Sequence, residues 1–285
     1  MSKTLLPIIT SLLTLSLLGC KPVSILNATV PSWGYHKNKS LTYGDLPRQK
    51  LDVYTPGRPK PNAPILVYFY GGTWQQGDKA EAQFVAEAFT SRGYVTIVPD
   101  YRLYPNVVFP AFIEDAALAV RWARDNAARF NADPTRIYLM GHSAGAHIAA
   151  LLVLDEKYLH DVGVDRTIIR AMAGMGGPYD FIANGEYAPI FAQPTTAPSP
   201  RSYNAIDFVD GDEPPMLLIQ GRADTLVDPA NATRLATRIR DQGGTVRCLM
   251  YPNINHSGNL LSLAWTFRWL APTLTDTTTF FTAHP

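Results

Sequence analysis

Cysteine is scarce in this sequence, with only Cys20 and Cys248 among 285 residues. Two cysteines give no disulfide framework. The chain also contains no H-E-x-x-H motif and no paired cysteine spacing, the patterns typical of zinc sites. Apolar residues, by contrast, make up 46% of the chain, which is enough for one large core. We therefore expect a fold stabilised by that core, without a metal site.

An excess of charge of one sign is also missing. The chain has 25 Lys and Arg residues against 24 Asp and Glu, with a formal net charge of +1 and no long run of either sign. Nucleic acids and anionic membrane surfaces are bound through extended basic patches or runs. We therefore expect no nucleic-acid partner, and a small neutral molecule fits this charge balance better.

The sequence has no apolar run that spans a bilayer comfortably. The longest one near the start, Leu5 to Leu18, is too short and follows a single Lys3, which is typical of a secretion signal. It ends in L-L-G-C, which resembles the bacterial lipoprotein box, where the signal is cut before a lipid-carrying cysteine. The resemblance implies a signal peptide over residues 1–19 and lipid attachment at Cys20.

This lipoprotein resemblance also implies a location. Residues 20–40 are mixed and polar and are expected to form a lipid-anchored tether. The protein would be exported and anchored to the bacterial cell envelope, with the membrane as a partner through the anchor. Lys21, where Asp would signal retention, favours the outer membrane. The alternative is an ordinary signal, or an uncleaved anchor, with an incidental cysteine.

From Leu41 onward, short apolar runs alternate with amphipathic segments. The runs predict strands at 64–70, 94–98, 136–140, 168–173, 215–220 and 246–251. The segments 112–124 and 228–242 between them have helical apolar spacing. Such alternation predicts an α/β fold with a mostly parallel sheet and helices on both faces.

The remaining segments complete the expected domain. L-D-V-Y at 51–54 and its preceding turn suggest an antiparallel edge hairpin. Residues 178–205 are rich in Pro, Gly and Ser and interrupt the alternation, so we expect a small lid or loop insertion there. We assign residues 41–285 to one catalytic domain.

The stretch G-H-S-A-G at 141–145 is the first chemical signal. It lies between a predicted strand and a predicted helix, which is the setting of a nucleophile elbow. There the serine occupies strained backbone geometry, and the following helix N-terminus favours a developing oxyanion. We interpret Ser143 as a nucleophile, the alternative being a serine in a structural turn.

An activated serine needs a histidine and a carboxylate. Asp224 follows the strand at 215–220 by four residues, where a loop can turn its carboxylate over the sheet edge. Its rival Asp228 directly precedes Pro229 and suits a helix cap. His256 follows the last strand at the same edge, and the chain order Ser, Asp, His is the one used by this sheet architecture. His142, beside Ser143, is expected to point away from it.

The stretch Y-G-G-T-W at 70–74 ends the first long apolar strand. Glycines let the backbone approach a substrate and present N–H groups, so this loop suits half of an oxyanion hole, with the N–H of Ala144 as the other half. A plain glycine turn is the alternative. Trp74 and Tyr179 are candidate substrate contacts, with a position in the core as the alternative for both.

These motifs together resemble the α/β-hydrolase superfamily, specifically small carboxylesterases related to hormone-sensitive lipase and kynurenine-formamidase-like enzymes. The similarity covers about Leu51 to Trp269 and includes Y-G-G-T-W, D-Y-R-L-Y-P, G-H-S-A-G-A-H-I-A-A-L, G-R-A-D-T-L-V-D-P and N-H-S. It implies a triad of Ser143, Asp224 and His256, with oxyanion donors from Gly72, Thr73 and Ala144. The family usually has His where this chain has Tyr70.

The resemblance implies a serine hydrolase that cleaves short-to-medium-chain carboxylic esters through an acyl-enzyme, without a cofactor. A small-molecule ester is the expected substrate. One alternative is an arylformamidase-like hydrolase of amides or formamides, which uses the same groups on a different leaving group. Another is a binding lipoprotein that has kept the fold without catalysis.

Overall fold

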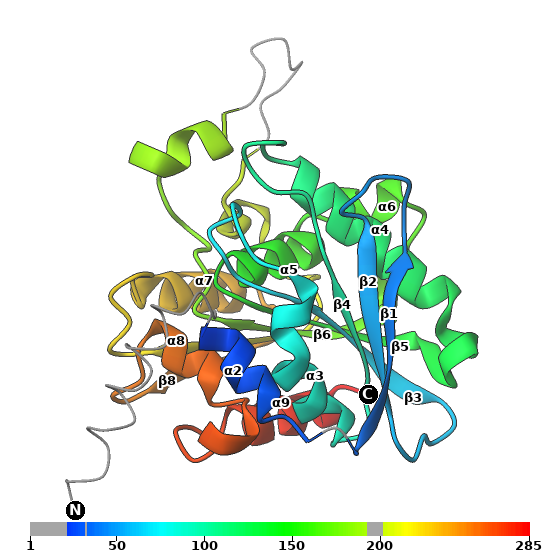
Figure 1. The fold of residues 1–285 in the computed structure, drawn as a ribbon. Coiled ribbons are helices and arrows are strands. Elements are labelled where there is room, and N and C mark those ends of the chain that lie inside the picture. The colour runs from blue at the N-terminus through cyan, green and yellow to red at the C-terminus, as the bar shows by residue number, and fades with distance from the viewer. Residues whose placement is uncertain (1–21, 32, 193–201) are drawn as a thin grey trace, which may run out of the picture.

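The computed structural model describes residues 22–31, 33–192 and 202–285 (Figure 1). The expected signal peptide and Cys20 lie outside these residues. Within the described ranges, no helix is both long and apolar enough to cross a membrane.

A single eight-stranded sheet forms the centre of the molecule, in the order β1-β2-β4-β3-β5-β6-β7-β8 (Figure 1). The two contacts made by β2, with β1 and β4, are antiparallel, whereas all the other neighbours are parallel. The strands are β1 Tyr35–Thr42, β2 Lys50–Pro56, β3 Ala63–Phe69, β4 Val95–Pro99, β5 Ala132–His142, β6 Ile169–Met175, β7 Met216–Gly221 and β8 Val246–Tyr251. The mostly parallel sheet and its antiparallel edge hairpin are therefore confirmed.

Helices cover both faces of this sheet (Figure 1). The α-helices are α2 Pro22–Ala28, α3 Gln83–Thr90, α4 Ala111–Asp125, α5 Ala144–Leu154, α6 Lys157–Asp161, α7 Ala230–Asp241, α8 His256–Leu261 and α9 Thr273–Ala283. The 3-10 helices are η2 Lys79–Ala82, η3 Ala127–Phe130, η4 Arg166–Ile168, η5 Gly185–Ile190, η6 Ala205–Phe208 and η7 Trp265–Phe267. Helix α4 illustrates why these helices pack on the sheet. Its residues Phe112, Ala116 and Val120 are spaced four apart, so they share one face of the helix, and all three are fully buried.

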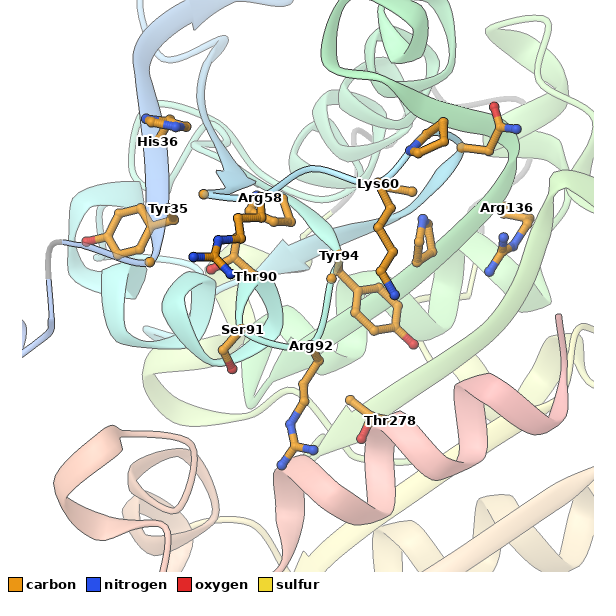
Figure 2. A pocket seen from close by; sticks show the side chains of 18 of the residues that line it. Tyr35, His36, Arg58, Lys60, Thr90, Ser91, Arg92, Tyr94, Arg136 and Thr278 are labelled. Atoms are coloured by element: carbon orange, nitrogen blue, oxygen red, sulfur yellow. The ribbon is translucent and has the colours of Figure 1, made fainter.

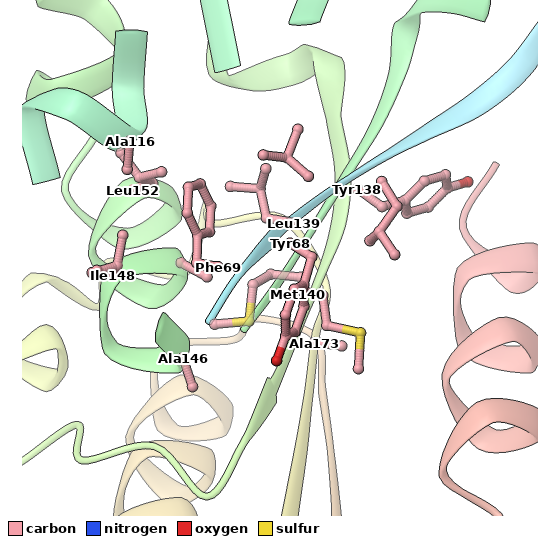
Figure 3. Close-up of a cluster of buried hydrophobic side chains, with 14 of the residues drawn as sticks. Tyr68, Phe69, Ala116, Tyr138, Leu139, Met140, Ala146, Ile148, Leu152 and Ala173 are labelled. Atoms are coloured by element: carbon pink, nitrogen blue, oxygen red, sulfur yellow. The ribbon is translucent and has the colours of Figure 1, made fainter. Parts of the chain in front are cut away.

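The core lies on both sides of the central strands. Figure 3 shows side chains of α4 and α5, including Ala116 and Ile148, packed against one face of the sheet, with α9 beyond the other. Leu139 and Met140, neighbours on β5, are both fully buried although they point to opposite faces. This double burial explains why the strand sequences are continuous apolar runs rather than alternating ones.

The described fold begins earlier than residue 41, where the sequence analysis starts the catalytic domain. Residues 22–28 form α2, and β1 begins at Tyr35. Both elements lie inside the range 20–40 assigned to a tether. The strand is hard to predict because it is the edge of the sheet, so its sequence Y-H-K-N-K-S-L-T is mostly polar and only partly covered.

Candidate active site

Ser143 occupies the turn that joins β5 to α5. Its backbone has φ 54° and ψ −123°, a sparsely populated conformation for a residue with a side chain. Both glycines of G-H-S-A-G are required here. A Cβ on Gly141 would lie 2.1 Å from the carbonyl oxygen of Gly145, and one on Gly145 would lie 2.0 Å from that of Phe69. The motif therefore forms the strained strand-to-helix elbow that its spacing predicts.

Asp224 and His256 are directly paired. The Nδ1 atom of His256 lies 2.8 Å from Oδ2 of Asp224, whose side chain is fully buried. The carboxylate also accepts hydrogen bonds from the backbone N–H groups of Leu226 and Val227 and from the Gln220 amide. These donors fix the carboxylate so that one oxygen faces the imidazole.

The rival carboxylate, Asp228, lies at the start of α7 and not beside His256. Asp228 Oδ1 accepts a hydrogen bond from the backbone N–H of Ala230 at the start of α7. Its side chain is 66% exposed and faces Arg234 at 3.8 Å. The structure therefore pairs Asp224 with the histidine, whereas Asp228 accepts a backbone hydrogen bond at the start of α7, where Pro229 occupies the N-cap position.

His256 and Ser143 line the same cavity, of about 580 Å³. His256 is the first residue of α8, and Asn255 caps that helix by accepting the Gly258 N–H at 2.8 Å. Gly176 packs against the pair, since a Cβ there would lie 3.2 Å from Nδ1 of His256. The three residues predicted from separate motifs thus meet at the carboxyl edge of the sheet.

His142 differs from expectation, because it does not point away from the site. Its side chain lines the same cavity, its Nε2 lies 3.1 Å from the carbonyl oxygen of His256, and the two rings are 4.7 Å apart. Burial, reinforced by His256, lowers the pKa of His142 to about 3. The neutral ring therefore donates its Nε2–H to that carbonyl. His142 and His256 are 114 residues apart in the sequence, so the sequence pattern does not predict this contact.

The loop after β3 brings backbone N–H groups to the cavity. Gly72 and Thr73 both line it and both have positive φ, 129° and 52°. The carbonyl of Gly72 accepts the N–H groups of Gln75 and Gln76, which closes the turn. Within the described residues, the N–H groups of Gly72, Thr73 and Ala144 donate to no acceptor in the protein. They are therefore available to donate to an oxyanion.

Tyr70 anchors this loop in a buried network. Its hydroxyl donates to Oδ1 of Asp100 at 2.9 Å and accepts from Arg48 at 2.8 Å. Lys79 completes the network with an ion pair to Asp100 at 2.9 Å, and the Tyr101 hydroxyl holds the Tyr70 carbonyl at 2.7 Å. Tyrosine in the place of the usual histidine therefore still ties the loop to the sheet.

The two proposed substrate contacts lie in the core. Trp74 is 4% exposed, and its ring packs on Phe181 and Phe191. Tyr179 is 1% exposed. Neither residue is among those that line the cavity at Ser143. Their burial favours the packing alternative, and their contact with substrate stays a prediction.

Helix α2 contributes a wall that the sequence analysis missed. Val23 lines the cavity together with Phe84 and Leu260. The side chain of Asn27 fixes the helix by donating to the carbonyls of Ala80 and Glu81 and accepting the N–H of Phe84. The polar composition of residues 20–40 gave no reason to expect a docked helix.

The fold and the arrangement of Ser143, His256 and Asp224 define the class: an α/β-hydrolase. The profile of the BD-FAE family matches residues 51–239, so the chain belongs to this family. A probable isoprenylcysteine alpha-carbonyl methylesterase of Oryza sativa subsp. japonica is 28% identical over 238 residues, which are 77% of this chain and 58% of that protein. Esterase LipC of Mycobacterium tuberculosis is 31% identical over 252 residues, 81% of this chain and 62% of that protein. The chain thus spans less than two thirds of the length of these relatives.

Solved structures support the same fold. Esterase B from Lactobacillus rhamnosis superposes with a TM-score of 0.80 at 21% identity, over 97% of this chain and 95% of that one. A truncated carbohydrate esterase from gut microbiota gives a TM-score of 0.74 at 22% identity, over 89% of this chain and 98% of that one. These likenesses confirm the α/β-hydrolase fold, and the relatives and neighbours named above are esterases.

Proposed function

We propose that this protein is a serine hydrolase of carboxylic esters, with Ser143 as nucleophile, His256 as general base and acid, and Asp224 as the residue that orients the imidazole. The observation that carries the proposal is the 2.8 Å contact of His256 Nδ1 with the buried Asp224, beside an elbow serine in the same cavity. This is the combination that activates a serine hydroxyl.

The chemistry follows from these positions. Nε2 of His256 takes the proton as Ser143 Oγ attacks the ester carbonyl, and returns it to the leaving alcohol. Asp224 stabilises the imidazolium that forms between these steps. Water, activated by His256, then releases the acid from the acyl-enzyme. Every group used in this scheme is on the chain.

The oxyanion would be held by backbone N–H groups. Gly72 and Thr73 line the same cavity as Ser143, and Ala144, the first residue of α5, directly follows Ser143 in the chain. Gly71 packs so closely against the serine that a Cβ there would lie 3.1 Å from that of Ser143. Donors fixed in this way stabilise the tetrahedral intermediate without rearrangement, and loss of one such donor typically costs a hundredfold or more in turnover.

The cavity supports a short-to-medium acyl or alcohol group. Its volume of about 580 Å³ is within the range of small-molecule sites. Apolar side chains of Val23, Phe84, Leu226 and Leu260 form part of its wall, which suits an uncharged ester.

The activity test compares the protein lacking residues 1–20 with its Ser143→Ala variant on p-nitrophenyl acetate, butyrate and decanoate. We expect turnover of the short esters by the parent and a loss of several orders of magnitude in the variant. N-formylkynurenine, assayed in parallel, separates esterase from formamidase activity. A parent that cleaves no ester would contradict the proposal.

We also propose that the protein is exported and anchored to the outer membrane through a lipid on Cys20. The support is the L-L-G-C motif after an apolar segment, and the position of Cys20 two residues before α2. Palmitate labelling of the full chain, compared with a Cys20→Ser variant, tests the anchor. Equal labelling, or none in either protein, would contradict it.

A further inference from the structure

A second and larger cavity lies at the opposite edge of the sheet from Ser143. Its volume is about 1150 Å³ (Figure 2). Residues at the amino ends of β3 and β4 and on α9 form its walls, with Arg136 on β5. Arg136 precedes Ser143 by seven residues along that strand, a separation of roughly 20 Å. A ligand in this cavity would therefore be well separated from the proposed nucleophile.

The charge of this cavity, which we call the basic cavity, is of one sign. Arg58, Lys60, Arg92 and Arg136 line it, and no Asp or Glu is among its described lining residues. Within the described ranges none of the four forms a salt bridge, although Arg136 interacts electrostatically with Asp133 and Tyr138 outside the cavity lining. On a chain with a net charge of only +1, four cations in one concavity are a marked local concentration.

Several cations outside this cavity are paired with buried carboxylates. Arg48 and Lys79, near the oxyanion loop, both face Asp100, at 3.6 and 2.9 Å. Arg102 pairs with the fully buried Asp115 at 2.8 Å. By contrast, the half-buried Arg136 has a buried Nε–H without an acceptor among the described residues. The basic cavity therefore holds four cations with no carboxylate among its described lining residues.

Aromatic rings accompany these cations. Figure 2 shows the charged side chains arranged around Tyr94, with Tyr35 at one side. Trp33 also lines the basic cavity and is 83% exposed, which is unusual for so large an apolar side chain. Such rings offer flat faces on which a sugar or a base can pack.

We propose that the basic cavity binds a small ligand that combines a ring with two or more oxyanion groups, either phosphates or carboxylates. Three of the four cations are arginine, whose planar fork pairs with both kinds of oxyanion through two parallel hydrogen bonds. Several anionic groups are needed to balance four cations. The aromatic side chains of the cavity provide surfaces on which a ring of the ligand can pack. The positive charge is confined to a concavity rather than spread over a face, which favours a small molecule over a nucleic acid.

The binding test uses the full chain in non-ionic detergent and isothermal titration calorimetry at low and high salt. The probes are ATP, inorganic pyrophosphate and trigalacturonate. We expect at least one of the two ring-bearing probes to bind with a Kd below about 1 mM at low salt, and more weakly at high salt. Tighter binding of ATP identifies phosphate as the anion, and tighter binding of trigalacturonate identifies carboxylate. No binding by either, or pyrophosphate binding as tightly as both, would overturn the proposal.

Two double variants locate the site. Arg58→Gln with Lys60→Gln changes exposed side chains and should weaken binding at least tenfold. Arg238→Gln with Arg240→Gln, on the exposed face of α7, removes the same charge elsewhere and should leave binding unchanged. Equal weakening by both would show a non-specific charge effect and overturn the proposal. Ester hydrolysis should be the same in all three proteins, so this test is independent of the proposed function.

Discussion

At the scale of single residues, the site depends on what holds His256. Asp224 fixes one side of the imidazole through Nδ1, and His142 holds the backbone of the same residue through its carbonyl. Since burial keeps His142 neutral, with a pKa of about 3, it can donate this hydrogen bond without adding a charge beside the base. We infer that His142 is a positioning residue for His256.

The change His142→Leu removes this donor and should lower kcat about tenfold, with little change in KM. A tenfold loss corresponds to one lost hydrogen bond of roughly 1–1.5 kcal/mol. Steady-state kinetics on a short ester measure this split. His160→Leu, on an imidazole that is 88% exposed, is the matched control and should behave like the parent. If kcat of the His142 variant equals that of the parent, the positioning role is refuted.

Two buried histidines also predict how stability depends on pH. Burial lowers the pKa of His142 to about 3 and that of His147 to about 4, from an ordinary value of 6.5. Between these values the unfolded chain binds more protons, so the free energy of unfolding is highest above pH 6.5 and falls as the pH falls. Each histidine should contribute a loss of about 2 kcal/mol between pH 7 and pH 5.

Urea unfolding at pH 7 and pH 5 measures this dependence, and His147→Phe isolates one contribution. The variant should lose about 2 kcal/mol less than the parent over this interval, because it lacks one of the two buried bases. An identical pH dependence in the two proteins would show that His147 is not kept neutral by the fold.

At the scale of elements, the segments differ in how well the sequence predicts them. The six predicted runs correspond to β3 through β8. The runs in β3 through β7 are almost entirely buried and therefore mostly apolar, whereas β8 is a partly covered edge strand that is apolar except for Arg247. Helix α2 was not predicted, and strand β1 was expected only as the partner of residues 51–54 in the edge hairpin, without bounds of its own. One is seven residues long and the other is a polar edge, so neither has an apolar period strong enough to detect.

Helix α2 leads to a prediction about substrate size. Val23 lines the catalytic cavity, so Val23→Trp should fill part of the space that a longer acyl chain would occupy. We expect turnover of p-nitrophenyl decanoate to fall at least tenfold relative to acetate, while acetate turnover stays close to that of the parent.

The control for this change is Ile182→Trp, at a position that is 82% exposed and does not line the cavity. The ratio of decanoate to acetate turnover should be unchanged in that variant. An unchanged ratio in Val23→Trp as well would mean that α2 does not limit the substrate.

At the scale of the whole molecule, the sequence revealed what depends on local pattern and missed what depends on long-range contact. The elbow at Ser143 is predictable because Gly141 and Gly145 lie within one five-residue motif, and the Asp224 and His256 loops are predictable because each follows a strand. The basic cavity is different, since its cations come from separate segments at 58–60, 92 and 136. Only the folded sheet brings these cations together, so the nearly zero net charge of the chain does not predict a charged site.

The two cavities lie at opposite ends of the parallel strands. The carboxyl edge carries the proposed catalytic groups, and the amino edge carries four cations with no carboxylate in the described lining of their cavity. The two proposed functions would therefore be separated by the length of the sheet.

The most direct test of the central claim is the intact mass of the protein after treatment with a fluorophosphonate, followed by peptide mapping. The account predicts a single covalent adduct on Ser143, formed rapidly by the parent and far more slowly by a His256→Ala variant, because the hydroxyl is activated by that base. A parent protein that stays unlabelled, or that carries the adduct on another serine, would contradict the account.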